Sequence, residues 1–443
     1  MKIELPDYIK TAINNLSRGG FKAYAVGGCV RDSIMGNIPH DWDLCTDALP
    51  DEVIATFSEY KAIGTGLKHG TVTVVIDDMP VEITTFRIDG VYSDSRRPDS
   101  VKFVRSLKED ISRRDFTINA IAYSDTEGLI DLFCGKEDIE NRLIRCVGEP
   151  EKRFSEDALR IMRALRFSSC LGFFIEEKTS LAIIENKKLI DSVAPERISV
   201  ELDKLLLGDN VAEVMRKYRE VIAQIIPEIK PCFDFSQKNP HHSLDVYEHI
   251  IKSIASIPKD RILRLTMLLH DIGKPECFSV DEKGIGHFKG HQKVSAQIAK
   301  EVLRRLRYDN DTISLVTTLI TEHDNRIPPE KKAVKRFLSK YGYEFFKLQT
   351  EIRRADCHAQ SPMLLKQKLG QIDDVTKLAE EILAQGECFS IKDLKIKGDD
   401  LLKIGFIEGK DIGDVLNRLL DGVIVGEFEN TEEVLIYKAK ELR

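Results

Sequence analysis

The sequence predicts an α+β protein, in which an N-terminal α/β head precedes a chain that is helical almost throughout. Between residues 20 and 145, short runs rich in β-branched residues alternate with glycines, as in AYAVGG, TVTVVI and VEITTFR, which is the pattern of strands. From about residue 150 onward, apolar residues recur at helical spacing, as in SEDALRIMRALRF and SVELDKLLL. A chain of 443 residues is too long for a single core, so we expect several packed units.

Three breaks in this pattern divide the chain into four predicted domains. The breaks are polar or contain glycine and proline, as turns and linkers do, and they lie at 148–150, 237–243 and 361–363. We expect a head at 1–147, a helical neck at 148–236, a histidine-rich helical domain at 237–362 and a helical tail at 363–443.

The composition predicts a cytoplasmic protein without membrane spans. Hydrophobic residues make up 42% of the chain and charged residues 31%, and no apolar run reaches the length of about 18 residues that a membrane helix needs. The first residues, MKIELPDYIKTAINN, lack the apolar core of a secretory signal. Nine scattered cysteines without a CxxC pair suggest buried, reduced thiols.

The net charge is −7, which taken alone argues against a nucleic-acid partner. Arginine is nevertheless dense at 87–114 and again at 153–166. We therefore expect a local positive cleft within an acidic protein.

The segment AYAVGGCVRDSIMGNIPHDWDLCT predicts a strand that ends in two glycines, a helix and a second strand. Gly27 and Gly28 let the backbone approach a triphosphate closely, and Arg31 on the helix adds positive potential. Asp41 and Asp43 are two residues apart, so on a strand both carboxylates point to one face. Each fragment alone is commonly a plain turn or a solvated strand edge. Together they place two hard oxygen ligands beside a phosphate cradle, which suits Mg²⁺ in a two-metal phosphoryl transfer.

A predicted helix beginning near Ser155 carries arginines on one side and apolar residues on the other. Arg160, Arg163 and Arg166 share the polar side. Such a face needs negatively charged partners. These come either from a ligand or, in the alternative interpretation, from Glu and Asp side chains on a solvated surface.

Asp157 and Arg160, one turn apart, suggest a way to choose between bases. A carboxylate only accepts hydrogen bonds and a guanidinium only donates them. Side by side, they complement a base edge with an amino group beside a ring nitrogen, which cytosine and adenine present and guanine and uracil do not. The pair is therefore a candidate protein template for C and A.

Histidine is concentrated in one region, since eight of the ten lie between His241 and His358. An adjacent His-Asp pair within the apolar run LTMLLHDIGKP buries two groups of the metal-ligating type beside leucines. Histidine and aspartate on successive helices can form a mononuclear or binuclear metal site in a bundle interior.

The long strings RRDFTINAIAY at 113–123, RFSEDALRIMRALRF at 153–167 and PERISVELDKLL at 195–206 make a resemblance specific. With the glycine and aspartate motifs, they resemble the DNA polymerase β-like nucleotidyltransferase superfamily, and within it the bacterial tRNA CCA-adding and poly(A) polymerase group. The resemblance covers nearly the whole chain. It implies an enzyme that adds C, C and A to the 3′ end of tRNA from CTP and ATP with Mg²⁺, and a tail that contacts tRNA.

The resemblance also implies roles for individual residues. The implied Mg²⁺ ligands are Asp41 and Asp43, and Glu82 in VEITTFR is the candidate third carboxylate, with Asp110 and Asp115 as alternatives. The implied nucleotide contacts, with the template pair and two arginines that hold phosphates or stack, are Gly28, Arg31, Arg114, Asp157, Arg160, Arg163 and Arg166.

Resemblance to known families also implies functions for two further segments. The polar stretch RIDGVYSDSRRPDSVKF at 87–103 is expected to be a mobile loop, which in the family accompanies addition of the final A. The histidine region resembles the HD phosphohydrolase superfamily, which implies a 2′,3′-cyclic phosphodiesterase or phosphatase that uses Mn²⁺, Ni²⁺, Co²⁺ or Mg²⁺. Its implied ligands are His249, His270, Asp271 and Asp356, with His291 and His323 matching the extra ligands of binuclear members.

Four alternatives remain open at this point. A bacterial poly(A) polymerase shares the same motifs, although the compact length and the lack of a long basic tail favour CCA addition. The histidine-rich domain can also be purely structural. An alarmone-type enzyme places its HD domain first, whereas here it comes second. A scaffold without activity does not need the intact set of acidic and histidine ligands.

Overall fold

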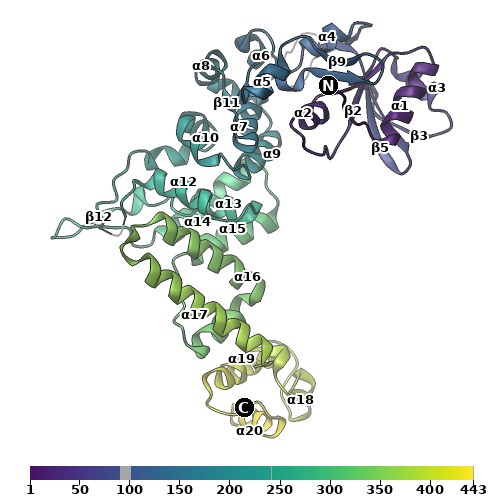
Figure 1. The fold of residues 1–443 in the computed structure, drawn as a ribbon. Helices are drawn as coiled ribbons and strands as arrows, with labels where there is room; N and C mark the ends of the chain where they lie inside the picture. Colours follow the sequence, from purple (N-terminus) through teal and green to yellow (C-terminus); the bar gives the residue numbers. More distant parts are fainter. Residues whose placement is uncertain (90–100, 241, 443) are drawn as a thin grey trace. The chain divides into compact units, whose positions relative to one another are not determined.

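The computed structural model describes residues 1–89, 101–240 and 242–442 (Figure 1). Their contacts divide the chain into two compact units, Met1–Lys230 and Pro231–Arg443. The first unit contains a mixed sheet followed by helices, and the second is almost entirely helical. The predicted α+β class is confirmed, while the boundaries of the four predicted domains stay predictions.

A seven-stranded sheet forms the head of the first unit, in the order β3-β4-β5-β2-β1-β8-β9. Neighbouring strands are antiparallel except β2 and β5, which are parallel. The strands are β1 (Ala23–Val26), β2 (Asp43–Thr46), β3 (Lys61–Gly66), β4 (Thr71–Ile76), β5 (Met79–Thr85), β8 (Ile121–Ser124) and β9 (Gly128–Asp131).

Alternation of apolar and polar residues explains why the middle of the sheet forms. In β4, every second residue of TVTVVI is buried, so Val72, Val74 and Ile76 face the core. Helices α1 (Asp7–Arg18) and α3 (Pro50–Thr56) pack against β4 and β5. The four strands predicted from sequence are all present, and β3, β8 and β9 are additional.

Two short strands bound the segment that was predicted to be a mobile loop. β6 (Arg87–Asp89) pairs antiparallel with β7 (Val101–Phe103), so the ends of the predicted loop are ordered as a ladder, which corrects that prediction. The centre of this loop, 90–100, lies outside the described residues.

Helices make up the rest of the first unit. They are α2 (Gly28–Ile34), α4 (Leu107–Ser112), α5 (Gly135–Glu140), α6 (Pro150–Glu156), α7 (Leu159–Leu171), α8 (Glu177–Glu185), α9 (Pro195–Leu206), α10 (Val211–Lys217) and α11 (Arg219–Ile225). A two-residue parallel pair, β10 (Leu143–Ile144) with β11 (Phe174–Ile175), lies among them.

The helix predicted to begin near Ser155 is in fact two helices. α6 ends at Glu156, Asp157 has the extended conformation of φ −142° and ψ 103°, and α7 begins at Leu159. The Asp157 side chain causes the break, because its Oδ1 accepts a hydrogen bond from the Leu159 N–H at 3.1 Å, as capping residues do.

The second unit confirms the prediction of a helical C-terminal part (Figure 1). Its one hairpin among the described residues pairs β12 (Ser279–Val280) with β13 (Gly286–His287). The helices are α12 (Val246–Ser256), α13 (Arg261–Leu269), α14 (His291–Arg305), α15 (Asn310–Glu322), α16 (Lys331–Ala359), α17 (Leu365–Ala384), α18 (Gly398–Lys403), α19 (Lys410–Val425) and α20 (Glu432–Glu441).

Two sequence expectations about surfaces and thiols can also be compared with the structure. No helix among the described residues is long and apolar enough to cross a membrane. All nine cysteines are free; six are buried and Cys277 is half-buried, but Cys134 and Cys170 are exposed, which corrects the expectation that all are buried.

Candidate active sites in the two units

Gly27 forms the turn between β1 and α2, with a φ of 85° that favours glycine. Its N–H donates to the Ile121 carbonyl at 3.2 Å, which ties the turn to β8. A Cβ at this position would lie 3.3 Å from Nη1 of Arg114. The missing side chain therefore lets the predicted nucleotide contact Arg114 approach the turn.

Three predicted acidic residues lie near the start of β2. Asp43 is its first residue and lies directly opposite Glu82 in the parallel register with β5. Asp41 is outside the strand rather than within it, because β2 begins two residues later. Asp41, Asp43 and Glu82 are all exposed, while the intervening Trp42 is buried.

The charges around Asp43 indicate a site for cations. Although Asp43 reaches solvent, desolvation by the surrounding protein and the negative charges of Glu82 and Asp41 raise its pKa above the ordinary value, while Arg114 lowers it. Neighbouring carboxylates repel each other unless a cation lies among them. The donor set is of the hard oxygen type that Mg²⁺ prefers.

The two alternative candidates for a third carboxylate are engaged elsewhere. Asp110 is buried and pairs with Arg113 at 2.8 Å and Arg114 at 3.4 Å. Asp115 is buried and pairs with Arg163 at 2.7 Å. Burial raises the pKa of Asp115, but Arg163 and Arg160 outweigh that effect and hold it at about 2. Glu82 is thus the candidate that faces Asp43.

A chain of hydrogen bonds links α7 to α2 across the head. Arg163 Nε donates to Asp115 Oδ2 at 2.7 Å, and Asn119 Nδ2 donates to Asp115 Oδ1 at 3.2 Å. Arg31 Nη1 in turn donates to Asn119 Oδ1 at 2.7 Å. Asn119 is 6% exposed. Two predicted nucleotide contacts, Arg31 and Arg163, are therefore positioned through a residue that sequence reasoning missed, although it lies within the RRDFTIN string.

Three of the predicted arginines surround one aromatic ring. The guanidinium carbons of Arg31, Arg163 and Arg166 lie 5.2, 5.3 and 4.0 Å from the centre of the Phe167 ring. Glu201 on α9 pairs with Arg166 at 3.2 Å and with Arg163 at 3.7 Å. The arginine face thus has acidic partners, as the alternative interpretation expected, but it is largely buried rather than solvated.

The structure does not place Asp157 and Arg160 as a pair. Asp157 Oδ2 pairs with Nη2 of Arg197 on α9 at 2.8 Å. Arg160 is 7% exposed and donates to the carbonyls of Arg153 and Arg113 at 3.0 and 2.9 Å and to Glu156 at 2.8 Å. Arg197 lies in the PERISV string, but its pairing across 40 residues has no local signal.

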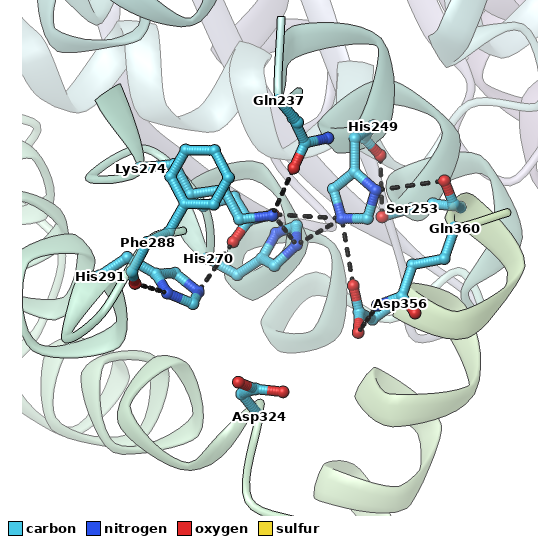
Figure 2. Close-up of polar contacts among 12 residues, drawn as sticks. Gln237, His249, Ser253, His270, Lys274, Phe288, His291, Asp324, Asp356 and Gln360 are labelled. Carbon is cyan, nitrogen blue, oxygen red and sulfur yellow. Dashed lines mark hydrogen bonds and ion pairs between the residues drawn. The ribbon is translucent and has the colours of Figure 1, made fainter. Parts of the chain in front are cut away.

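In the second unit, the predicted ligands His249, His270, His291 and Asp356 lie close together (Figure 2), and the four histidines contact Asp271. The His-Asp pair lies just after the end of α13, since His270 caps the helix, and not inside it. Asp271 Oδ2 lies 3.1 Å from Nε2 of His249 and 3.2 Å from that of His270. Asp271 Oδ1 lies 3.2 Å from Nε2 of His291 and 3.8 Å from that of His323.

Backbone carbonyls fix the orientation of all four histidine rings. Nδ1 of each ring lies within 3.2 Å of a carbonyl oxygen, which belongs to Ala359 for His249, Met267 for His270, Phe288 for His291 and Ile320 for His323. An N–H at Nδ1 that donates to a carbonyl leaves the Nε2 lone pair free, as in histidines that bind metals. Every Nε2 therefore points toward Asp271.

The cluster fits two metal ions that share Asp271. One group of three buried ligands is His249, His270 and Asp271, and the other is Asp271, His291 and His323, with the ligand atoms of each group within 4.8 Å of one another. Nε2 atoms face each other at 3.3 Å between His249 and His270 and at 3.4 Å between His291 and His323. Both oxygens of Asp271 are buried, and each faces two histidine Nε2 atoms, one from each ring of a pair.

The pKa values of His249 and His323 shift in opposite directions. Burial lowers the pKa of His249, but its contacts with Asp271 and Asp356 outweigh that effect and raise it to about 9. Burial and the neighbouring His270 lower the pKa of His323 to about 4. Two buried carboxylates thus draw a positive charge to His249; a bound cation would supply that charge instead and leave the Nε2 lone pair free as a ligand.

Further residues complete the cluster. Asp356 on α16 lies 3.1 Å from His249 Nε2 and accepts a hydrogen bond from Gln360 at 2.7 Å. Lys274 is 4% exposed; its ammonium lies 2.7 Å from Asp271 and donates to Gln237 at 3.0 Å (Figure 2). Sequence reasoning missed Lys274 and Gln360. Lys274 follows Asp271 by three residues, which is a usable signal, whereas Gln360 has none.

A cavity of about 560 Å³ opens over the cluster. Its floor includes Asp271, His291, His323 and Asp356. The cationic side chains that line it are Lys274, Lys289, Arg326 and Lys368. Metal ligands and cationic side chains lining one cavity suit an anionic ligand.

Three known families match successive parts of this chain. The Poly A polymerase head domain matches residues 23–145, and the probable RNA and SrmB-binding site of polymerase A matches residues 172–233. A putative tRNA nucleotidyltransferase domain 2 matches residues 283–439.

Two relatives that match this chain over nearly its whole length share one name. The CCA-adding enzyme of Ligilactobacillus salivarius is 34% identical over 99% of this chain and 98% of its own length. That of Enterococcus faecalis is 33% identical over 99% of this chain and 97% of its own length. Among solved structures, the Bacillus stearothermophilus CCA-adding enzyme in complex with CTP superimposes with a TM-score of 0.71 and 30% identity, covering 98% of this chain and 96% of that one.

Proposed function

This chain belongs to the family of CCA-adding enzymes, which are nucleotidyltransferases, and from that premise we propose that it adds C, C and A to the 3′ end of tRNA from CTP and ATP. The observation that carries the proposal is the placement of Asp43 opposite Glu82, beside Asp41 and the Gly27 turn. The solved relative in complex with CTP supports it.

In this proposal the head performs phosphoryl transfer. Asp41, Asp43 and Glu82 would hold Mg²⁺, which would supply positive charge for the triphosphate and for the departing pyrophosphate. Arg31 and Arg114, beside Gly28, bind the triphosphate. The tRNA 3′-oxygen forms a bond to the α-phosphorus, the bond to the β-phosphate oxygen breaks, and the 3′-hydroxyl proton is released. Arg163 and Arg166 hold phosphates or stack.

Base selection belongs to Asp157 and Arg160 in this account. A guanidinium carries five N–H groups, and the described hydrogen bonds of Arg160 use three of them. Two N–H groups of Arg160 therefore have no acceptor among the described residues. The side chain is thereby anchored and still able to donate to a ring nitrogen. Arg197 holds Asp157 in place to accept from the amino group of C or A.

Stepwise incorporation tests this function. Incubation of tRNA lacking CCA with CTP alone is expected to add C residues, and a terminal A is expected only when ATP follows. Incorporation of A without any C would instead identify a poly(A) polymerase.

The helical tail at 363–443 is proposed to contact tRNA, so its removal is expected to raise the KM for tRNA more than that for CTP.

The Asp271 cluster supports a second activity, a metal-dependent phosphohydrolase that acts on 2′,3′-cyclic phosphates or phosphate monoesters. His249, His270, Asp271, His291, His323 and Asp356 would hold Mn²⁺, Ni²⁺, Co²⁺ or Mg²⁺. A divalent ion there supplies charge for the phosphate and makes water more acidic. A water oxygen bonds to phosphorus, the bond to one ribose oxygen breaks, and that oxygen takes a proton.

Variants of the cluster separate the two activities. Changing His270→Ala together with Asp271→Ala is expected to abolish hydrolysis of a 2′,3′-cyclic nucleotide while CCA addition continues. If the wild-type protein hydrolyses nothing with any of the four metals, the cluster is structural.

A further inference from the structure

Three cations around the cavity over Asp271 have no carboxylate partner among the residues that the structure describes. They are Lys289, Arg326 and Lys368, and all line the cavity. The fourth, Lys274, is already paired with Asp271. Unpaired cations that converge on one cavity produce a positive potential that an anionic ligand offsets.

The cations come from two different parts of the fold. Lys274 lies three residues after Asp271, whereas Arg326 follows α15 and Lys368 lies in the first turn of α17. Lys368 donates to Gln360 Oε1, and Gln360 donates to Asp356 Oδ2 at 2.7 Å. The ammonium of Lys368 is therefore linked to the cluster through Gln360 and Asp356, whereas that of Lys274 contacts Asp271 directly.

The size and lining of the cavity indicate a polar ligand larger than one phosphate. Its volume of about 560 Å³ falls in the range of pockets that bind whole small molecules. Phe288 and Leu364 are the only large apolar residues among its described lining. Lipid-like and other apolar substrates do not fit this lining.

We infer that the cavity receives the phosphorylated 3′ end of an RNA strand, with Arg326 and Lys368 binding the phosphate that precedes the one being hydrolysed. This inference rests on the proposed hydrolase activity and adds its substrate class. The metal ligands and Lys274 suffice for the reacting phosphate. Of the three remaining cations, Arg326 and Lys368 are assigned to a second phosphate, and Lys289 adds positive charge to the same cavity. Hydrolysis leaves that second phosphate unchanged.

Two substrates that differ by one phosphate test this inference. Uridine 2′,3′-cyclic phosphate is compared with the same nucleotide carrying a 5′-phosphate, because uridine probes avoid a head that selects C and A. The wild-type kcat/KM is expected to be about tenfold higher for the second substrate, the effect of one charge-assisted contact. The Arg326→Ala and Lys368→Ala double variant is expected to lose that ratio, whereas the exposed Lys283→Ala control keeps it.

Binding without metal provides a readout independent of hydrolysis. In the presence of a chelator, uridine 3′,5′-bisphosphate is expected to bind the wild-type protein about tenfold more tightly than uridine 3′-phosphate, and the double variant is expected to bind both alike. The Arg326→Lys variant should retain most of the difference in affinity between the two uridine phosphates, because the positive charge remains.

The outcomes separate the inference from the function on which it rests. Hydrolysis of both cyclic substrates at equal kcat/KM, with equal binding of the two uridine phosphates, overturns the inference and leaves the hydrolase intact. Absence of all hydrolysis overturns the hydrolase, and the binding contrast then decides by itself whether the cavity recognises a second phosphate.

Discussion

Glu82 lies directly opposite Asp43 in the parallel register of β5 and β2. Directly opposed residues of neighbouring strands project from the same face of a sheet, and the charge of Glu82 raises the pKa of Asp43. This relationship turns two separate sequence motifs into one acidic site, and it makes Glu82 testable as the third carboxylate.

Substituting Glu82→Gln is expected to lower CTP incorporation by at least about 100-fold. Loss of a carboxylate that holds Mg²⁺ removes several kcal/mol of transition-state stabilisation, and each 1.36 kcal/mol corresponds to about tenfold in rate. Single-turnover incorporation measures the loss. The matched control is Asp78→Asn, an exposed acid in the turn before β5 whose φ of 60° asparagine tolerates. Equal rates for the two variants would remove Glu82 from the site.

Substituting Asp157→Asn is expected to weaken selection of C and A. The change replaces an acceptor-only group with one that also donates, so incorporation of C and A should fall by about 10–100-fold relative to U, the effect of one hydrogen bond to a charged group. Competition between CTP and UTP measures the ratio. Glu151→Gln on the exposed side of α6 is the control, and an unchanged ratio in the Asp157 variant would contradict the template role.

The buried ion pair of Asp115 with Arg163 is expected to make stability depend on acid pH. Because the folded pKa of Asp115 is about 2, below its ordinary value, the contribution is complete above about pH 5 and is lost as the pH falls toward 2. Wild-type free energy of unfolding should therefore fall by about 2 kcal/mol more than that of Asp115→Asn over this range. Urea unfolding at a series of pH values measures this, and parallel curves would contradict it.

Metal binding at the Asp271 cluster is expected to stabilise the second unit. Mn²⁺ or Ni²⁺ at about 100 times its dissociation constant should add about 2.7 kcal/mol to the free energy of unfolding, and metal analysis should find two ions per cluster. His270→Ala removes a ligand of only one group, so it should bind one ion instead of two and gain less stability from metal. His287→Ala, which lines the cavity but pairs with Asp281 outside the cluster, should retain both ions and the full gain in stability. No metal-dependent shift in the wild-type protein would argue for a purely structural cluster.

The sequence predicted what local patterns encode. The strands around Gly27, Asp43 and Glu82 follow from runs of β-branched residues punctuated by glycines. His270 and Asp271 follow from their chemical type beside an apolar run, whereas the other ligands were implied only by a family resemblance. The break at Asp157 was missed, because helical periodicity continues through it while the side chain caps the next helix.

Contacts between distant segments could not be predicted from one sequence. Arg160 was expected beside Asp157, yet it reaches the carbonyl of Arg113, 47 residues away, and Asp157 instead pairs with Arg197. Such partners depend on how α6, α7 and α9 pack, and no spacing rule within a single helix contains that information.

The 3′ ends of tRNA products test the central claim most directly. Transcripts that lack CCA are incubated with the wild-type protein, CTP and ATP, and the added nucleotides are sequenced. We expect products that end in C, C and A, with no further extension, and we expect no extension by Asp43→Asn. Products that carry runs of A directly on the unextended end would contradict the central claim.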